Sequence, residues 1–261
     1  RRAGIEFDWS IEPEPLGTGG AIRNAAELID LEAAKVAHEE FVIFNGDVLS
    51  LHSIAEQLEF HRKHQADVTL HLINVEDARA FGCVPTDSEG RVTAFLEKME
   101  NPVTKFINAG CYVFSPQVIK EIELGKVVSV EREVFPELLK GERVVQAFVD
   151  NSYWLDMGTP KALLKGSQDY VGTREFIVGE NANISTSAKI SGASAIGNDV
   201  TIGANVEISA SIIRDGATIA EGCKFESVFI EFDVFFVFGI EGNKIEILVQ
   251  ILDNFFVFES G

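Results

Sequence analysis

A six-residue repeat in the second half of the chain restricts the fold more than any other feature of the sequence. Isoleucine stands at every sixth position over five successive repeats, at Ile184, Ile190, Ile196, Ile202 and Ile208. The repeat breaks near residues 209–211 and resumes at Ile213, Ile219 and Phe225. A sustained short period of this kind predicts a parallel β-helix, in which each short strand stacks on its copy one coil away. Residues 173–261 are therefore expected to form a separate repeat domain.

The last part of this domain is expected to be irregular, from about residue 227. Nine of the chain's 20 phenylalanines fall between Phe225 and Phe258. Phenylalanine at an inward position would overfill a narrow coil, because a packed interior tolerates added volume poorly. Three interpretations remain open for this segment: irregular packing, a surface for a partner, or a corrupted reading of the gene.

In the first half, an apolar run ends abruptly in an amide, a glycine and a carboxylate, Phe41-Val42-Ile43-Phe44-Asn45-Gly46-Asp47. Four consecutive apolar residues before a turn signal predict a strand buried on both faces, as in a parallel sheet flanked by helices. Asp47 then stands at the carboxyl end of the strand, where open α/β sheets bind ligands. A carboxylate there is well placed to hold a divalent cation, although the tripeptide alone is explained more simply as a turn.

Glycine-rich or acidic turns end three other segments. Residues 12–21 combine two prolines with Gly17, Gly19 and Gly20 before a predicted helix that runs to about Ile29. Such a turn suits an anion or a flat base, because the first N–H groups of a helix are unpaired. Glu97 and Lys98 form an adjacent acid and base at a strand end, and Asp156 precedes a glycine turn.

Two hairpins and an amphipathic helix are expected between these turns. The first hairpin joins residues 81–86 to 91–98 through the turn at 87–90, and the second joins 143–149 to 152–155. The helix is predicted over residues 52–64. Its inward side chains are expected to be Leu51, Ile54, Ala55 and Leu58, with His61 and His64 at a solvated end.

Composition excludes several classes of function. The chain has 22 Lys and Arg against 41 Asp and Glu, a formal charge of −19, so it is a poor non-specific partner for nucleic acid or an anionic membrane. The cysteines are Cys83, Cys111 and Cys223, and their spacing suits buried reduced thiols in a cytoplasmic protein. No apolar run is long enough to cross a bilayer.

Six motifs, in order, resemble those of sugar-1-phosphate nucleotidylyltransferases over about residues 4–172. They are Pro15-Leu16-Gly17-Thr18-Gly19-Gly20-Ala21, Asn45-Gly46-Asp47-Val48-Leu49, Phe81-Gly82-Cys83-Val84, Glu97-Lys98, Asn108-Ala109-Gly110-Cys111-Tyr112 and Trp154-Leu155-Asp156-Met157-Gly158-Thr159-Pro160. The segments 79–87 and 129–136 are most similar to bacterial mannose-1-phosphate guanylyltransferases. The resemblance implies an α/β, Rossmann-like nucleotidyltransferase domain over residues 1–172, followed by a left-handed parallel β-helix of hexapeptide repeats.

The resemblance also implies the chemistry and the residues that serve it. A sugar-phosphate oxygen attacks the α-phosphorus of a nucleoside triphosphate and pyrophosphate leaves, so positioning and charge neutralisation are the protein's main tasks. The implied roles are Mg²⁺ binding for Asp47 and Asp156, contact with the sugar phosphate for Lys98, sugar binding for Gly82, Glu97 and Asn108, and contact with the base for Leu16 and Gly17. GTP and mannose-1-phosphate are the implied substrates, and a homo-oligomer formed through the β-helix is expected.

One departure from the family pattern affects these expectations. Members begin with a strand and a Gly-rich loop that cradles the triphosphate through an Arg and a Lys, and nothing precedes Arg1 here. The chain is then either a fragment of an enzyme, which we favour, or a subunit that binds triphosphate poorly. Such a chain could be inactive by itself.

Other functions stay open on the sequence alone. Thymidylyl or uridylyl transfer to glucose-1-phosphate is the nearest competitor, because guanine and mannose rest on the resemblance. A non-catalytic regulatory subunit is the second alternative, which the carboxylates Asp47 and Asp156 disfavour. An acyltransferase built on the β-helix is the third, and it usually needs a histidine at the coils. All five histidines lie at or before His71.

Overall fold

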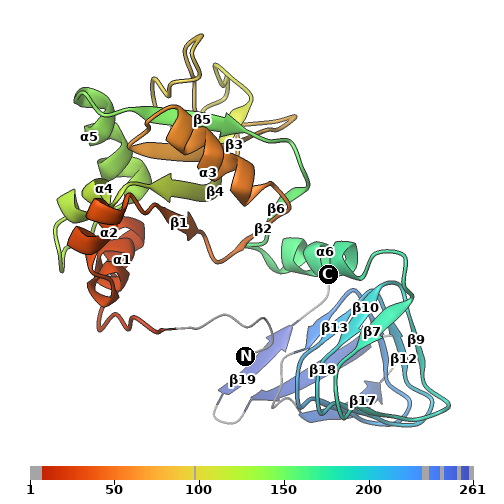
Figure 1. Ribbon diagram of the computed structural model, residues 1–261. Coiled ribbons are helices and arrows are strands. Elements are labelled where there is room, and N and C mark those ends of the chain that lie inside the picture. The colour runs from red at the N-terminus through yellow and green to blue at the C-terminus, as the bar shows by residue number, and fades with distance from the viewer. Residues whose placement is uncertain (1–7, 97, 231–234, 242–243, 252–253, 259–261) are drawn as a thin grey trace. The chain divides into compact units, whose positions relative to one another are not determined.

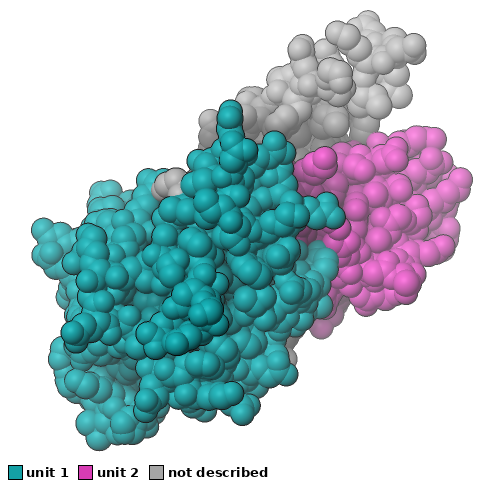
Figure 2. All heavy atoms as spheres, turned by 90° about the horizontal axis from the view of Figure 1, so that it is seen from above, with its two compact units in different colours: residues 1–154 teal, residues 155–261 magenta. Residues whose placement is uncertain are grey.

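A computed structural model describes residues 8–96 and 98–230, and the backbone of residues 235–241, 244–251 and 254–258. The chain divides into two compact units, residues 1–154 and 155–261 (Figure 2). The domain boundary expected at residue 172 stays a prediction. None of the helices in these described ranges is long and apolar enough to span a membrane.

The first unit is built on a four-stranded mixed sheet. Its strands are β1 (Phe41–Phe44), β4 (Phe106–Phe114), β3 (Val68–Asn74) and β5 (Val145–Val149), in that order across the sheet. β3 and β5 are parallel, and β4 runs antiparallel to both of its neighbours. Six of the seven side chains of β3 are buried, so β3 and β4 form the centre of the core.

The prediction of a fully buried parallel strand at residues 41–44 is wrong in two respects. β1 stands at the end of the strand order and pairs antiparallel with β4. Its first three residues are half-buried and Phe44 is 45% exposed. An apolar run signals burial but does not identify the neighbours of a strand, and here a long antiparallel strand occupies the centre instead.

Short helices connect and cover the strands (Figure 1). α1 spans Gly17–Ala25 and continues as a 3-10 turn at Ala26–Leu28. The remaining helices of the unit are α2 (Leu31–Ala37), α3 (Ile54–Lys63), α4 (Pro116–Glu121), a π-helical turn at Val130–Val134 and α5 (Phe135–Lys140). The short strand β2 (Val48–Ser50) follows the turn after β1.

The inward face of α3 is polar, contrary to the sequence prediction. Leu51 is 69% exposed and Ile54 is 41% exposed, whereas Gln57 and His61 are buried. The side-chain amide of Gln57 donates to the carbonyl oxygen of Thr69 at 3.3 Å, and His61 Nδ1 shares a 2.9 Å hydrogen bond with the Thr69 hydroxyl. Because β3 presents polar residues on this face, the helix packs with matching polar groups.

One of the two predicted hairpins is confirmed and the other is wrong. Cys83 and Leu96 exchange two backbone hydrogen bonds across an antiparallel bridge, and the turn at 87–90 closes the hairpin. The segment 145–149 instead enters the main sheet as β5, beside β3. The Tyr153 carbonyl accepts from the Leu51 N–H, so residues after 150 leave β5 rather than fold back on it.

In the second unit, β6 (Trp154–Asp156), which begins at the last residue of the first unit, leads into α6 (Pro160–Val171). Thr159 caps α6 through its hydroxyl, as expected. A β-solenoid of about three turns follows. Its parallel strands are β7 (Phe176–Val178), β8 (Asn183–Ile184), β9 (Lys189–Ser191), β10 (Ser194–Ile196), β11 (Thr201–Ile202), β12 (Glu207–Ser209), β13 (Ile212–Ile213), β14 (Thr218–Ile219), β15 (Lys224–Glu226) and β16 (Phe229–Ile230).

The repeat predicted this solenoid correctly. The strands stack in three sheets, so Ile184 pairs with Ile202 and Ile202 with Ile219. The interior contains the repeat isoleucines, and it also accommodates Phe225, which is only 7% exposed. Beyond Ile230 the backbone forms β17 (Phe235–Glu241), β18 (Lys244–Ile251) and β19 (Asn254–Phe258), and β18 pairs antiparallel with both β17 and β19. The side chains of these three strands lie outside the described residues.

Candidate functional site

The carboxyl end of β1 turns sharply at the expected place. Residues 46–47 form the turn, and Asp47 is exposed. The Asn45 N–H donates to the carbonyl oxygen of Gly110 at 2.8 Å. Asp47 therefore projects from a turn that is anchored to the central strand β4.

Gly110 allows this anchoring. It has a φ of +74°, and an added Cβ would lie 2.9 Å from Asn45 Nδ2 and 3.0 Å from Val48 Cγ2. The register between β3 and β4 shifts at the same place, between Leu70 and Leu72. The register shift spans Gly110, and Asn108 lies two residues before it, at the end of β4 that neighbours the Asn45 turn.

Asn108 is held by a buried tyrosine. Its side-chain Nδ2 donates to the Tyr112 hydroxyl at 2.8 Å, and its side-chain Oδ1 accepts from the Gly110 N–H at 3.1 Å. The Tyr112 hydroxyl in turn donates to Glu131 Oε1 at 3.2 Å. Burial, reinforced by the charge of Glu131, raises the pKa of Tyr112, so its hydroxyl remains a donor near neutral pH.

Glu131 also ties the glycine-rich segment to this group. Its Oε2 accepts from the hydroxyls of Thr18 at 3.1 Å and Ser129 at 3.2 Å. The Thr18 hydroxyl oxygen accepts from the Val130 N–H at 2.9 Å. Sequence reasoning missed Glu131 and Tyr112. The segment 129–136 was singled out by resemblance, but its spacing does not show which of its two glutamates faces the site.

The glycines at the start of α1 allow this segment to pack closely against residues 126–128, and they do not leave N–H groups free for a ligand. The N–H groups of Gly19 and Gly20 both donate to the Val128 carbonyl, at 2.8 and 3.3 Å. A Cβ on Gly20 would overlap the carbonyl of Lys126. The backbone of Leu16 is also engaged, because its N–H donates to the Glu12 carboxylate at 3.0 Å and its carbonyl accepts from Val128. Gly17 lies beside Leu16, with a φ of +69°.

The first hairpin lies beside the Asn108 strand. Cys83 and Leu96 belong to the same apolar cluster as Ile107 and Ala109, the chain neighbours of Asn108. Gly82 is buried and has a φ of +72°, a conformation that favours glycine. The structure thus brings Gly82 close to the Asn108 edge. Lys98 is exposed at the end of the hairpin, and Glu97 lies outside the described residues.

The two predicted metal-binding carboxylates belong to different units. Asp47 lies in the first unit, and Asp156 ends β6 in the second. Asp156 is exposed, and its Oδ1 accepts from the Gly158 N–H at 2.8 Å. Where the structure describes side chains, no three His, Cys, Asp or Glu residues are grouped to hold a metal ion. Mg²⁺ commonly takes one or two carboxylates and completes its shell with water and phosphate oxygens, so exposed aspartates of this kind fit it.

All three cysteines are free and buried, as predicted. Burial raises the pKa of the Cys111 thiol to about 12. A protonated, buried thiol is a poor nucleophile and a poor metal ligand. Cys111 lies in β4 and packs there as a small apolar residue. Its thiol donates a weak hydrogen bond to Oε1 of Gln57, on α3, at 3.4 Å.

Comparison with known proteins identifies the family. The family model for nucleotidyl transferase matches residues 1–172. A mannose-1-phosphate guanylyltransferase of Mycobacterium tuberculosis is 53% identical over 169 residues, covering 64% of this chain and 45% of that protein. A probable mannose-1-phosphate guanylyltransferase 3 of Arabidopsis thaliana is 33% identical over 184 residues, covering 68% of this chain and 54% of that protein. The chain thus spans about half the length of the curated relatives it matches.

Among solved structures, HddC from Yersinia pseudotuberculosis complexed with GMP-PN is 30% identical, with a TM-score of 0.49. The likeness covers 61% of this chain and 64% of that chain. The residues matched by the family model include the turn after β1, Gly110, and Glu131 with its hydrogen-bond partners. The chain belongs to the nucleotidyl transferase family.

Proposed function

We propose that this chain contributes residues of a nucleotidyltransferase site, which transfers a guanylyl group from GTP to mannose-1-phosphate and releases pyrophosphate. The observation that carries the proposal is the convergence of the Asn45–Asp47 turn, Asn108 and the Gly82 hairpin at one edge of the sheet. The 53% identity to a relative with that name supports the choice of guanylyl and mannose.

The residues divide the work by charge and by hydrogen bonding. Asn108 keeps a fixed orientation through Tyr112 and Gly110, which suits a side chain that binds sugar hydroxyls. Lys98 is an exposed ammonium in a very acidic chain, and it would bind the sugar phosphate as a point charge. Gly82 would line the sugar site, and Glu97 would accept from sugar hydroxyls. Leu16 and Gly17 would contact the base.

Asp47 and Asp156 are the residues that would hold Mg²⁺. The ion would supply charge neutralisation for the triphosphate in a chain whose formal charge is −19. In the first unit, the backbone hydrogen bond from Asn45 to Gly110 keeps Asp47 in place. In the second, the Gly158 N–H orients one oxygen of Asp156 and leaves the other for a ligand.

A pyrophosphate-release assay on the full 261-residue chain tests this function. The panel combines GTP, TTP and UTP with mannose-1-phosphate and glucose-1-phosphate, with and without Mg²⁺. We expect release to be greatest for GTP with mannose-1-phosphate in Mg²⁺, and Asp47→Asn to reduce it at least about a hundredfold. Preference for another pair, or activity that Asp47→Asn leaves unchanged, would contradict the proposal. The same samples are to be tested for binding of GDP-mannose. If the chain shows no turnover, binding of GDP-mannose still supports the proposed site, and absence of binding contradicts it.

We further propose that the solenoid mediates homo-oligomer formation, that it is left-handed, and that the protein works in the cytoplasm. The free, buried cysteines agree with a reducing compartment. Light scattering on the full chain and on a chain that ends at residue 172 would separate the two domains' contributions. A multimer that persists without the solenoid would contradict its role in assembly.

A further inference from the structure

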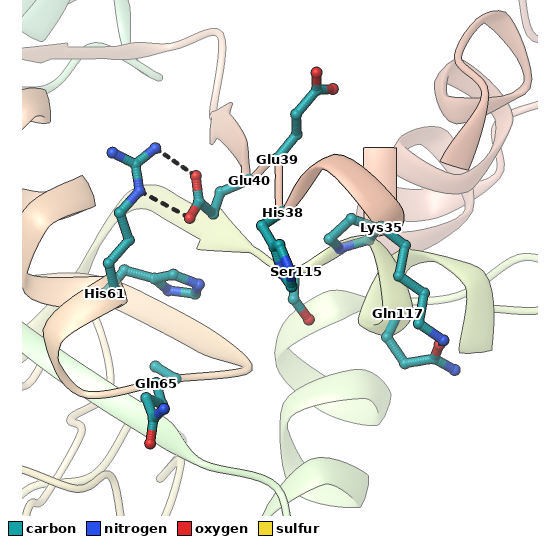
Figure 3. Close-up of a pocket in the computed structure, with 11 residues that line it drawn as sticks. Lys35, His38, Glu39, Glu40, His61, Gln65, Ser115 and Gln117 are labelled. Atoms are coloured by element: carbon teal, nitrogen blue, oxygen red, sulfur yellow. Dashed lines mark hydrogen bonds and ion pairs between the residues drawn. The ribbon is translucent and has the colours of Figure 1, made fainter. Parts of the chain in front are cut away.

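A cavity lies at the other end of the sheet from Asp47. It has a volume of about 420 Å³ and is open to solvent on one side. Its walls come from the end of α2, the start of β1, the end of α3 and the connection from β4 to α4 (Figure 3). Glu40, just before β1, is one wall residue, and Asn45 follows β1. Five extended residues separate the two positions by roughly 17 Å, so the cavity is distinct from the candidate substrate site.

A buried hydroxyl in this cavity has no partner among the described residues. Ser115 precedes α4 at the position where a serine normally caps a helix, but its side chain makes no capping hydrogen bond. Its Oγ is buried and unpaired. A buried polar group without a partner costs stability, and it usually signals a water molecule, an ion or a ligand. Ser115 Oγ is closed off from solvent in this conformation, so its hydroxyl reaches an occupant of the cavity only when the side chain rotates.

A buried histidine lines the same cavity. His61 is only 3% exposed, and its Nδ1 is engaged with the Thr69 hydroxyl at 2.9 Å. The other ring nitrogen, Nε2, remains for a ligand. Figure 3 shows the rings of His61 and His38 and the side chain of Ser115 around the cavity. These groups can all donate a hydrogen bond.

The charges around the cavity also favour an anion. Both oxygens of Glu40 are already taken by the Arg62 guanidinium, at 2.9 and 2.6 Å. Lys35 Nζ donates to Gln117 at 3.0 Å, and an ammonium group has two further N–H donors. Figure 3 shows the carboxylate of Glu39 directed away from the other labelled side chains. Within the described part of the chain no three metal ligands are grouped here, which disfavours a cation.

We propose that this cavity binds a small oxyanion, a phosphate or a carboxylate, through Ser115, His61, His38 and Lys35. Rotation of the Ser115 side chain would let its unpaired hydroxyl donate a hydrogen bond to the anion, and the ammonium of Lys35 would balance the charge. Such a site is separate from the residues proposed for nucleotidyl transfer, and it suits a ligand that is recognised independently of the substrates.

Imidazole NMR of the full chain, during titration with inorganic phosphate or acetate at constant ionic strength, tests the proposal. The signals of His61 and His38 are expected to shift and saturate. His52 and His71 serve as internal controls. They stack on each other at 4.0 Å, and neither of them lines the cavity. Their signals are expected to stay unchanged. Saturation with only one of the two anions identifies the ligand class.

Two serine variants separate binding from folding. Ser115→Ala removes an unpaired hydroxyl, so it should weaken phosphate or acetate binding roughly tenfold without lowering the unfolding midpoint. Ser53→Ala removes a hydroxyl that caps α3 by accepting from Glu56 at 3.2 Å. It should lower the unfolding midpoint and leave anion binding unchanged.

Absence of saturable shifts at His61, equal shifts with chloride, or unchanged anion binding in Ser115→Ala would overturn the proposal. Lys98→Met, in the proposed substrate site, should still bind the anion even if it loses nucleotidyl transfer, so the two proposals can fail separately.

Discussion

At the scale of single residues, Glu131 holds the candidate site together. It accepts hydrogen bonds from Thr18, Ser129 and Tyr112, which come from three separate segments. Tyr112 then orients Asn108. A carboxylate suits this position because its two oxygens only accept hydrogen bonds, and the hydroxyl groups of all three neighbours donate them.

Replacing Glu131 by glutamine should therefore loosen the site. Glutamine keeps the size of the side chain but turns one acceptor into a donor, which leaves a hydroxyl facing an N–H group. We expect the free energy of unfolding to fall by about 1–3 kcal/mol, measured by urea denaturation. Glu133→Gln is the matched control. Glu133 is exposed and accepts from the Ser129 N–H at 2.9 Å, so its loss should be about 1 kcal/mol or less. Equal effects in both variants would contradict the role of Glu131.

The buried histidines make stability depend on pH. Burial lowers the pKa of His71 from 6.5 to about 4 and also lowers the pKa of His61. The unfolded chain binds protons more tightly than the folded chain, so this stability is complete above about pH 6.5 and is lost as the pH falls toward 4. For His71 the loss amounts to about 3 kcal/mol.

Urea denaturation between pH 7 and pH 4.5 checks this dependence. His71→Gln should flatten the decline above pH 5, where ordinary carboxylates are still ionised. Ser53→Ala, which removes the cap of α3 and changes no titratable group, should lower stability at every pH and leave the decline unchanged. A decline of the same slope in all three proteins would show that the buried histidine is not its cause.

At the scale of elements, the glycines of α1 show what the sequence could not reveal. The pattern predicted a helix after a glycine-rich turn, and α1 forms there. The partner of that turn, residues 126–128, lies more than a hundred positions away in the chain. The polar face of α3 and the pairing of β5 escaped prediction for the same reason, because each depends on which side chains of β3 lie opposite. Local patterns specify elements, but distant neighbours decide which faces are buried.

Gly20→Ala tests the packing of α1. The added methyl group would overlap the Lys126 carbonyl and lie 2.7 Å from the Leu16 Cβ. We expect a loss of about 1–3 kcal/mol in the free energy of unfolding. Gly46→Ala is the control, because a Cβ there meets nothing within 4 Å. Equal stability of the two variants would show that α1 does not need this close contact.

At the scale of the whole molecule, the solenoid was the most predictable part and the candidate site the least. The six-residue period determines which residues face inward, so Ile196, Ile202 and Ile208 are buried as expected. The site is assembled from separate segments, and the motifs identify these segments without giving their contacts. The turn carrying Asp47 was predicted, whereas its anchor at Gly110 and the network through Glu131 emerge only from the fold.

The solenoid also allows a simple stability test. Ile208 is 1% exposed in the middle of the stack, so Ile208→Ala should cost about 2–4 kcal/mol. Thr201 is exposed on the outward side of the strand that carries the buried Ile202, and Thr201→Ala should cost less than about 0.5 kcal/mol. Thermal and urea unfolding of both variants measure the difference. Similar costs would contradict the inward and outward assignment of the repeat.

The measurement that tests the central claim most directly is calorimetric titration of the full chain with GDP-mannose in the presence of Mg²⁺. The proposed site predicts saturable binding, weakened at least about tenfold by Lys98→Met, because one charge contact with the ligand is lost. Ser115→Ala, at the far end of the sheet, should bind GDP-mannose as the unaltered chain does. If the unaltered chain does not bind GDP-mannose, or if Lys98→Met binds it equally well, the substrate site does not lie at the edge of the sheet formed by Asp47, Asn108 and the Gly82 hairpin.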